Sequence, residues 1–547
     1  MGKKEQRAIN ARNVKQRANK SSNIVSIIVI ISRITGFFRT STQAWALGAA
    51  GLASAYTVAN NLPNLLYELV VGGMLITSFL PVYLSVKKKM GRNGASAYVS
   101  NLLSIVLLLM IALTVVSFVL AAPIIWTQSA GATTGFDSEL AIWFFRWFVV
   151  EILLYALSSI ISGALNAERS YVASNLAPVF NNLIVIASFV IYDYLVRSMG
   201  MPWYNAAIVL AVGNPLGVAV QVICQLPSMR RQGIRLTPRI NLRDPALRDT
   251  LSIGIPTLVA TLASVPTTAV MSSCALSVTE AGASVAYYAR IWYMLPYSVF
   301  AVPISVTMFT ELSASYIAED MRAFKYFFAD GFRKTFFTLV PCSMFLVVFA
   351  PSLIAVFAGG QFDGEAVGLT TGYLQALALS LPFYALTTYL QKTCSSMMHM
   401  GFFAAATCAA SALQIVVCLV LTPLWGLYVV PVSSVFYYGA IDVLVLWKIR
   451  SIVGALGMSR VVRSAIIALV FGILGSIVGW LALLGITAIM GPCEGLMRGA
   501  LYTFVGGVPA VLVTYGATSL LGISDAPFFD SLFTRVFSLL RKDKGAR

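Results

Sequence analysis

Three arginines lie inside apolar stretches that are long enough to cross a membrane. Arg33 and Arg39 belong to "SRITGFFRTSTQAWALG" (32–48), and Arg290 belongs to "ARIWYMLPYSVFAVP" (289–303). A guanidinium at the centre of a bilayer costs roughly 3 kcal/mol on insertion scales, and its planar fork pairs well with two oxygens of a phosphate. These residue types therefore favour a water-filled cavity within the membrane, or an anionic ligand that supplies the missing charge.

The first two arginines lie deep in their predicted span. At 1.5 Å per residue, Arg33 lies about 14 Å and Arg39 about 22 Å from a span start near residue 24. Glu68 is the one clear carboxylate inside a span, and one negative charge cannot balance three cations. The alternative is that one or more of the arginines caps a broken helix or binds backbone carbonyls. Gly36, between Arg33 and Arg39, is a candidate bend.

Other charged residues fall near the ends of predicted spans, where long side chains reach the interface. We expect this behaviour for four of them, namely Arg146, Asp193, Glu311 and Asp442. Glu151 falls within the predicted span 139–165, and the sequence assigns it no role.

Proline and glycine interrupt the helices that carry or adjoin the charges. Pro63 and the pair Gly72-Gly73 fall in one predicted span, and Pro296 falls in another. Broken helices are tolerated in a bilayer where the freed carbonyls line a cavity or packed protein. The two segments are also alike, because "AYTVANNLP" (55–63) and "AYYARIWYMLP" (286–296) both run from Ala-Tyr to Leu-Pro. This likeness indicates an internal duplication.

The whole chain has the composition of a membrane protein. Of its 547 residues, 58% are hydrophobic and only 11% are charged, and the mean hydropathy is +0.83. Apolar runs of about 20 residues, enough to span a bilayer, recur to the end of the chain. We predict an all-α polytopic protein of about fourteen transmembrane helices, with two pseudo-symmetric six-helix lobes around a central cavity plus two C-terminal helices. The predicted spans are 24–46, 56–86, 98–126, 139–165, 171–194, 206–228, 250–276, 284–316, 335–358, 368–395, 401–422, 428–448, 462–488 and 498–522.

Basic residues are concentrated on alternate connections between these spans. Those connections hold 32 of the 38 lysines and arginines, including "KKKMGR" (87–92). Cytoplasmic loops carry such an excess, so we expect both termini to be cytoplasmic. The expected parts are a basic tail (1–23), an N-lobe (24–228), a basic linker (229–249), a C-lobe (250–448), two further helices (462–522) and a C-terminal tail (523–547).

The sequence gives little support to other classes of function. Topology and contact with the lipid bilayer explain the basic runs, so nucleic acid is not an expected partner. The single histidine, His399, and seven cysteines without a CxxC motif disfavour a metal site or a disulfide framework. The chain has no DxD, HExxH or P-loop GK[ST] motif, and its outer loops are too short for a catalytic domain. We therefore expect a transporter without a cofactor, rather than an enzyme.

An ordered series of motifs resembles one known family. "SRITGFFR", "NNLPNLLYELVVGG", "GALNAERSYVASNLAPVFNN", "QLPSMRRQG", "LSIGIPTL" and "YYARIWYMLP" occur in the order and spacing typical of the MurJ (MviN) lipid II flippases. These belong to the superfamily that also contains multidrug and oligosaccharidyl-lipid exporters. The similarity covers roughly residues 24–450.

The resemblance implies a substrate and a mechanism. It implies that the undecaprenyl-pyrophosphate-linked disaccharide-pentapeptide moves from the inner to the outer leaflet of the bacterial cytoplasmic membrane by alternating access. Arg33 and Arg39 correspond to the family's two first-helix arginines, and Arg290 to its eighth-helix arginine. In the family these line a central cationic cavity that serves the substrate's diphosphate.

The chain departs from the family at several positions. Many members have Arg-Arg where this chain has Tyr67-Glu68, a variant that resembles actinobacterial-type members. We therefore add Asn64, Tyr67 and Glu68 to the candidate substrate-binding residues, with Glu68 as a candidate partner for Arg39.

Further departures lie elsewhere. Ser54 stands where an aspartate is usual, and Gln414 and Cys418 stand where asparagine is frequent in a proposed cation site, which disfavours sodium coupling there. The alternatives are a flippase for another lipid-linked oligosaccharide or a multidrug exporter of the same superfamily. The sequence leaves open the headgroup variant, the driving force and the oligomeric state. Cell-wall synthesis or regulatory proteins are candidate partners of the cytoplasmic tails.

Overall fold

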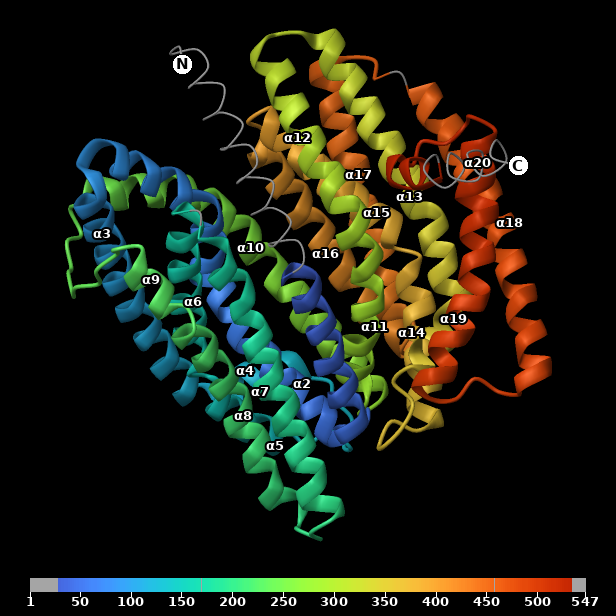
Figure 1. Ribbon diagram of the computed structural model, residues 1–547, viewed down its shortest axis with the longest axis horizontal. Coiled ribbons are helices and arrows are strands. Elements are labelled where there is room, and N and C mark those ends of the chain that lie inside the picture. The colour runs from blue at the N-terminus through green and yellow to red at the C-terminus, as the bar shows by residue number, and fades with distance from the viewer. Residues whose placement is uncertain (1–27, 169, 457, 534–547) are drawn as a thin grey trace, which may run out of the picture. The chain divides into compact units, whose positions relative to one another are not determined.

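The structure is a computed structural model that describes residues 28–168, 170–456 and 458–533 (Figure 1). Side chains are described except at 71–78, 81, 249, 251–261, 263, 264 and 458. The predicted basic tail (1–23), the last part of the predicted C-terminal tail and Arg169 lie outside the described residues.

Helices make up nearly all of this part of the chain, and it contains no β-strand. Residues 28–47 form the first helix. The following elements are α2 (Gly51–Tyr67), η1 (Glu68–Gly72), α3 (Gly73–Val119), α4 (Ala121–Ser129), α5 (Ser138–Phe148), α6 (Glu151–Ala167), α7 (Tyr171–Arg197), α8 (Trp203–Ile223), α9 (Leu226–Arg231) and α10 (Pro245–Val278). The rest are α11 (Gly282–Pro296), η2 (Tyr297–Ala301), α12 (Val302–Ile317), α13 (Met321–Ala355), α14 (Gly364–Ala378), α15 (Leu381–Ser396), α16 (Met400–Trp425), α17 (Val429–Val453), α18 (Met458–Met490), α19 (Gly495–Val511), η3 (Leu512–Gly516) and α20 (Ala517–Leu520).

The long helices account for the predicted spans. Nine are long and apolar enough to cross a membrane, and the bent pairs α5–α6 and α14–α15 raise this number to eleven. Residues 28–47, α2 with its π-helical continuation, and α10 stand at three further predicted spans. The prediction of an all-α polytopic membrane protein is therefore confirmed, and the described helices are consistent with about fourteen spans.

The chain forms two compact units. Unit 1 contains the described residues up to Ala46, Val58–Trp126 and Ser138–Thr261. Unit 2 contains Leu47–Thr57, Thr127–Asp137 and the described residues from Leu262 onward.

In unit 1, α7 and α8 lie side by side through small residues (Figure 1). A Cβ atom at Gly213 would come within 2.3 Å of Ser188 Cβ, and one at Gly217 within 2.4 Å of Asn181 Oδ1. Small residues allow this close approach between membrane helices. At one end of the unit, Lys87 Nζ on α3 pairs with Glu168 Oε1 after α6 at 2.6 Å.

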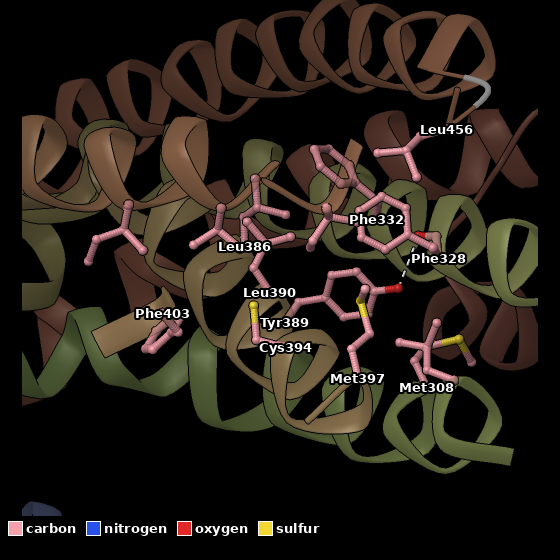
Figure 2. Packing of buried hydrophobic residues seen from close by; sticks show 14 of the residues in the cluster. Met308, Phe328, Phe332, Leu386, Tyr389, Leu390, Cys394, Met397, Phe403 and Leu456 are labelled. Carbon is pink, nitrogen blue, oxygen red and sulfur yellow. Dashed lines mark hydrogen bonds between the residues drawn. The ribbon is translucent and has the colours of Figure 1, made fainter. Parts of the chain in front are cut away.

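In unit 2, aromatic and aliphatic side chains from α12, α13, α15, α16 and α17 form a core. Figure 2 shows Tyr389 inside it, with its hydroxyl donating to the backbone oxygen of Phe328 at 3.0 Å. Gly331 makes room for this ring, because a Cβ atom there would lie 2.6 Å from the Tyr389 hydroxyl. The buried polar atom is thus satisfied within an otherwise apolar cluster.

Unit 2 also contains two short segments from the first third of the chain, residues 47–57 and 127–137. Ser54 Oγ donates to Ser284 Oγ at 3.3 Å, and the Tyr288 hydroxyl donates to the backbone oxygen of Gly48 at 2.8 Å. The Gly131 backbone N–H donates to Ser273 Oγ at 3.0 Å. We call these contacts the unit 2 junction.

Candidate functional site

Arg39 belongs to a polar network that joins four helices of unit 1. Its Nη2 donates to Asn214 Oδ1 on α8 at 3.3 Å, and Asn214 in turn donates to Asn60 Oδ1 on α2. Asn214 is only 1% exposed. Because buried polar groups need partners in a low-dielectric interior, these asparagines fix the half-buried guanidinium in place. With Glu151 and Tyr155 of α6, described next, we call this group the unit 1 polar network.

Glu151 is the acidic member of the network. It is fully buried, and it is the first residue of α6, just after the 40° bend between α5 and α6. One carboxylate oxygen accepts a hydrogen bond from the Tyr155 hydroxyl at 3.2 Å, and the carboxylate interacts electrostatically with Arg39. The positive end of the α6 dipole also favours an anion at this position. The Glu151 carboxyl group therefore lies within reach of the Arg39 charge inside the unit.

From the sequence, Glu68 is the predicted partner of Arg39, and Glu151 has no predicted role. Glu68 is exposed, and its carboxylate accepts from Asn64 Nδ2 at 3.2 Å on the same helical segment. Tyr67 is 8% exposed, and its ring packs against that of Tyr155 at 6.2 Å between centroids. A single carboxylate in the apolar stretch "FVVEILLY" (148–155) indicates that Glu151 needs a polar partner inside the membrane. The sequence does not indicate that the neutral Asn60 and Asn214 lie near Arg39.

Arg33 lies on the same first helix as Arg39 but in a different environment. Its side chain is exposed, whereas Arg39 is half-buried. The helix is uninterrupted through Gly36, and Asn182 Nδ2 on α7 donates to Thr35 Oγ1 at 3.1 Å. The helix is thus held against α7 near the position of Arg33.

Arg290 lies in unit 2, on α11. Its side chain is exposed, and its charge acts on four tyrosines, Tyr293, Tyr373, Tyr384 and Tyr438. These residues come from α11, α14, α15 and α17, respectively. The charge of Arg290 therefore reaches a cluster of tyrosines that the sequence alone does not predict.

Both predicted interrupted helices contain a π-helical segment. In unit 1, α2 contains Pro63 and is followed by η1, which ends at Gly72, so that α3 begins at Gly73. In unit 2, α11 ends at Pro296 and is followed by η2. π-Helical turns disturb the regular hydrogen-bond ladder and often occur at functional sites. Each break lies in the same continuous run of helix as a candidate site residue.

One expectation for the charged residues at span ends is wrong. Asp442 was expected to reach the interface, but it is 3% exposed and accepts a hydrogen bond from Thr387 Oγ1 at 2.7 Å. It lies on the side of α17 that faces α15, so its distance from the helix end does not bring it to solvent. Asp193 is also buried, at 8% exposed, and pairs with the more exposed Arg197 at 2.8 Å from its Nε. Arg146 is exposed and lies over the Phe118 ring. Glu311 is exposed.

The positions where the family often has asparagine hold a neutral hydrogen-bonded group. Gln414 Nε2 donates to Ser433 Oγ at 3.0 Å, and Cys418 Sγ lies 3.2 Å from the same oxygen. Within the part of the chain that the structure describes, no group of three or more His, Cys, Asp or Glu residues could hold a metal ion. Ser54, another departure, contributes to the unit 2 junction.

Comparisons with known proteins show which family this chain resembles. The model of the family described as lipid II flippase MurJ matches residues 43–490. The lipid II flippase MurJ of Burkholderia cenocepacia is 26% identical over 363 residues, which cover 65% of this chain and 69% of that protein. The probable lipid II flippase MurJ of Vibrio cholerae is 25% identical over 393 residues, or 69% of this chain and 72% of that protein.

Solved structures show the same fold. A lipid II flippase MurJ in an inward closed conformation matches 91% of this chain and 99% of its own, with a TM-score of 0.71 and 18% identity. An inward-facing multidrug resistance MATE family transporter of the MOP superfamily matches 79% of this chain and 99% of its own, with a TM-score of 0.65 and 16% identity. The family match spans most of the sequence and confirms the resemblance. The chain therefore belongs to the MurJ family of lipid II flippases, which are transporters and not enzymes.

Proposed function

We propose that this chain moves lipid II, the undecaprenyl-pyrophosphate-linked disaccharide-pentapeptide, from the inner to the outer leaflet of the bacterial cytoplasmic membrane. The names of the relatives support the substrate, and the charges inside the spans support its chemistry. The observation that carries the proposal is that both Arg33 and Arg290 have exposed side chains, Arg33 on the helix 28–47 at the first predicted span and Arg290 on the helical run Gly282–Ile317, which is long and apolar enough to cross a membrane. A lipid-facing guanidinium is costly, so these positions favour a water-filled cavity that receives an anion.

The charge balance within each unit supports a diphosphate ligand. In unit 1, Arg39 donates to Asn214 and lies within reach of the Glu151 carboxyl group. Among the described residues, the ion pairs involve neither Arg33 nor Arg290. Both guanidiniums therefore keep their hydrogen-bond donors available, and a diphosphate offers several anionic oxygens in the geometry that guanidinium groups bind best.

Alternating access is the mechanism we propose for the transfer. The diphosphate would bind from the inner leaflet while the lipid tail stays in the bilayer, and a change in conformation would then release the headgroup outside. The unit 2 junction would separate in that step, and the three hydrogen bonds that define it are few enough to open reversibly. Outward transfer of an anion is favoured by an inside-negative potential, by about 2.3 kcal/mol per charge per 100 mV.

The proposal also includes the topology. Both termini would be cytoplasmic, because alternate connections carry 32 of the 38 basic residues. The N-lobe (24–228) and the C-lobe (250–448) would supply the first-helix arginines and Arg290, respectively.

Complementation tests the function directly. The chain is expressed in a bacterium depleted of its own lipid II flippase, and externalised lipid II is measured by its accessibility at the cell surface. We expect wild type to rescue growth and externalisation, and Arg290→Ala to do neither while still inserting into the membrane. Arg146→Ala is the matched control, since this span-end arginine lies over Phe118 and should keep its activity. Good expression without rescue would shift the substrate to another lipid-linked oligosaccharide.

A further inference from the structure

A cluster of tyrosines in unit 2 lies within reach of the Arg290 charge. Tyr297 and Tyr384 stack with ring centroids 4.3 Å apart and 29° between planes. Tyr384 also meets Tyr438 at 4.9 Å and Tyr293 at 5.9 Å. Tyr297, Tyr384 and Tyr438 are each partly exposed, whereas Tyr293 is 4% exposed and backs the group. We call Tyr297, Tyr384 and Tyr438 the tyrosine platform.

Local structure fixes the platform beside the arginine. Arg290 and Tyr297 are seven residues apart, close to two helical turns, so they lie on the same side of the helix about 10 Å apart along its axis. Tyr297 is the first residue of η2, directly after Pro296. The Tyr297 hydroxyl lies 3.1 Å from Thr388 Oγ1 on α15, and that of Tyr293 lies 2.9 Å from Ser380 Oγ. These bonds tie α11 and η2 to α15, so the rings are held before any ligand arrives.

The composition of this surface points to one kind of ligand. An aromatic face is electron-rich and attracts polarised C–H groups such as those on one face of a pyranose ring, while phenol hydroxyls exchange hydrogen bonds with sugar hydroxyls. Packing alone would be served by buried phenylalanine or leucine, yet these rings are partly exposed and carry hydroxyls. An arginine at one end of the surface supplies the group that a sugar phosphate requires.

We infer that the tyrosine platform binds the carbohydrate of the lipid-linked substrate, with the sugar next to the diphosphate stacked on these rings while Arg290 holds a phosphate. This inference rests on the proposed function and adds which part of the headgroup unit 2 recognises. It predicts that unit 2 distinguishes glycosylated from sugar-free polyprenyl diphosphates.

The test compares two lipids on purified, full-length protein in lipid nanodiscs. The probes are lipid II, which carries the disaccharide, and undecaprenyl diphosphate, which carries no sugar. We expect wild type to bind lipid II more tightly. Tyr384→Leu and Tyr438→Leu should each weaken lipid II binding about two- to tenfold, the loss of one aromatic contact, and leave undecaprenyl diphosphate binding unchanged. Tyr384→Phe, which keeps the ring, should retain most of the preference.

Tyr316→Leu is the matched control. This half-buried tyrosine of unit 2 packs on Phe324 with centroids 5.8 Å apart, away from the platform, and its loss should leave the ratio of the two affinities unchanged. Unchanged binding of the sugar-free lipid shows that a platform variant is folded. Equal weakening of both lipids by the leucine variants would mean a packing role and overturn the inference. A wild type that binds both lipids equally would overturn it and leave the flippase intact, whereas binding of neither lipid would overturn the proposed function as well.

Discussion

Replacing Arg39 with alanine should destabilise unit 1 through Glu151. The variant leaves a fully buried carboxylate without the cation that acts on it, although the Tyr155 hydrogen bond remains. The buried carboxyl group can take a proton, so its charge need not remain uncompensated. The loss of stability should therefore be about 1 to 2 kcal/mol, that of the lost hydrogen bond from the guanidinium to Asn214, and less than that for breaking a buried ion pair.

A double-mutant cycle separates this structural role from transport. Glu151→Gln removes the charge and keeps an amide oxygen that can accept from Tyr155, so its own effect on stability should be within about 1 kcal/mol. Combined with Arg39→Ala, it should restore about 0.5 to 1 kcal/mol of the lost stability, because neither member then leaves an uncompensated charge. The double variant should remain inactive in flipping, since the guanidinium is still missing.

The cycle is measured by thermal unfolding of the detergent-purified protein and by lipid II externalisation in depleted cells. Arg33→Ala combined with Glu151→Gln is the control, because Arg33 is not among the groups that act on Glu151. It should show additive stabilities. Additive effects for Arg39 and Glu151 would refute the pairing, and a flipping-competent double variant would refute the role of Arg39 in binding.

Three further predictions concern the rest of the fold. Burial would raise the pKa of Glu168, but hydrogen bonds and the charge of Lys87 outweigh it and hold the pKa below its ordinary value. Wild type should therefore exceed Glu168→Gln in stability by about 1 to 2 kcal/mol at pH 7 and lose this advantage as the pH falls below about 4.3, in unfolding measured against pH. Gly217→Leu should disrupt the packing of α7 and α8, because its Cβ atom would lie 2.4 Å from Asn181 Oδ1. A folded variant with an unchanged unfolding temperature would contradict this close contact. Asp442→Asn should leave the unfolding temperature equal or higher, since the amide oxygen still accepts a hydrogen bond and no charge is buried; a marked fall would show that the carboxylate itself is required.

Helix positions could be predicted because the bilayer sets their length and polarity. The predicted span 171–194 and the observed α7 (Tyr171–Arg197) begin at the same residue. The breaks were harder to place. Pro63 lies inside α2, and the irregular backbone begins at Glu68, because an α-helix can lose one hydrogen bond at proline and continue when neighbours pack around it.

The neighbours of the arginines could not be predicted from one sequence. Arg39 meets Asn214, which lies 175 residues away, and hydropathy does not report which neutral amides share an interior. The predicted exposure of Asp442 is wrong because the position of a residue along a helix does not show which side of the helix faces the core. The tyrosines near Arg290 come from four helices, and only the fold brings them together.

The central claim is that fixed cations within the membrane bind the diphosphate of a lipid. The most direct measurement is the affinity of the purified protein in nanodiscs for undecaprenyl diphosphate and for undecaprenol, which has no phosphate. Wild type should bind only the diphosphate tightly, and Arg290→Ala should weaken that binding about tenfold or more, the loss of a charge-assisted hydrogen bond. Equal affinity of wild type for the two lipids, or an Arg290→Ala variant that binds the diphosphate as wild type does, would contradict the account.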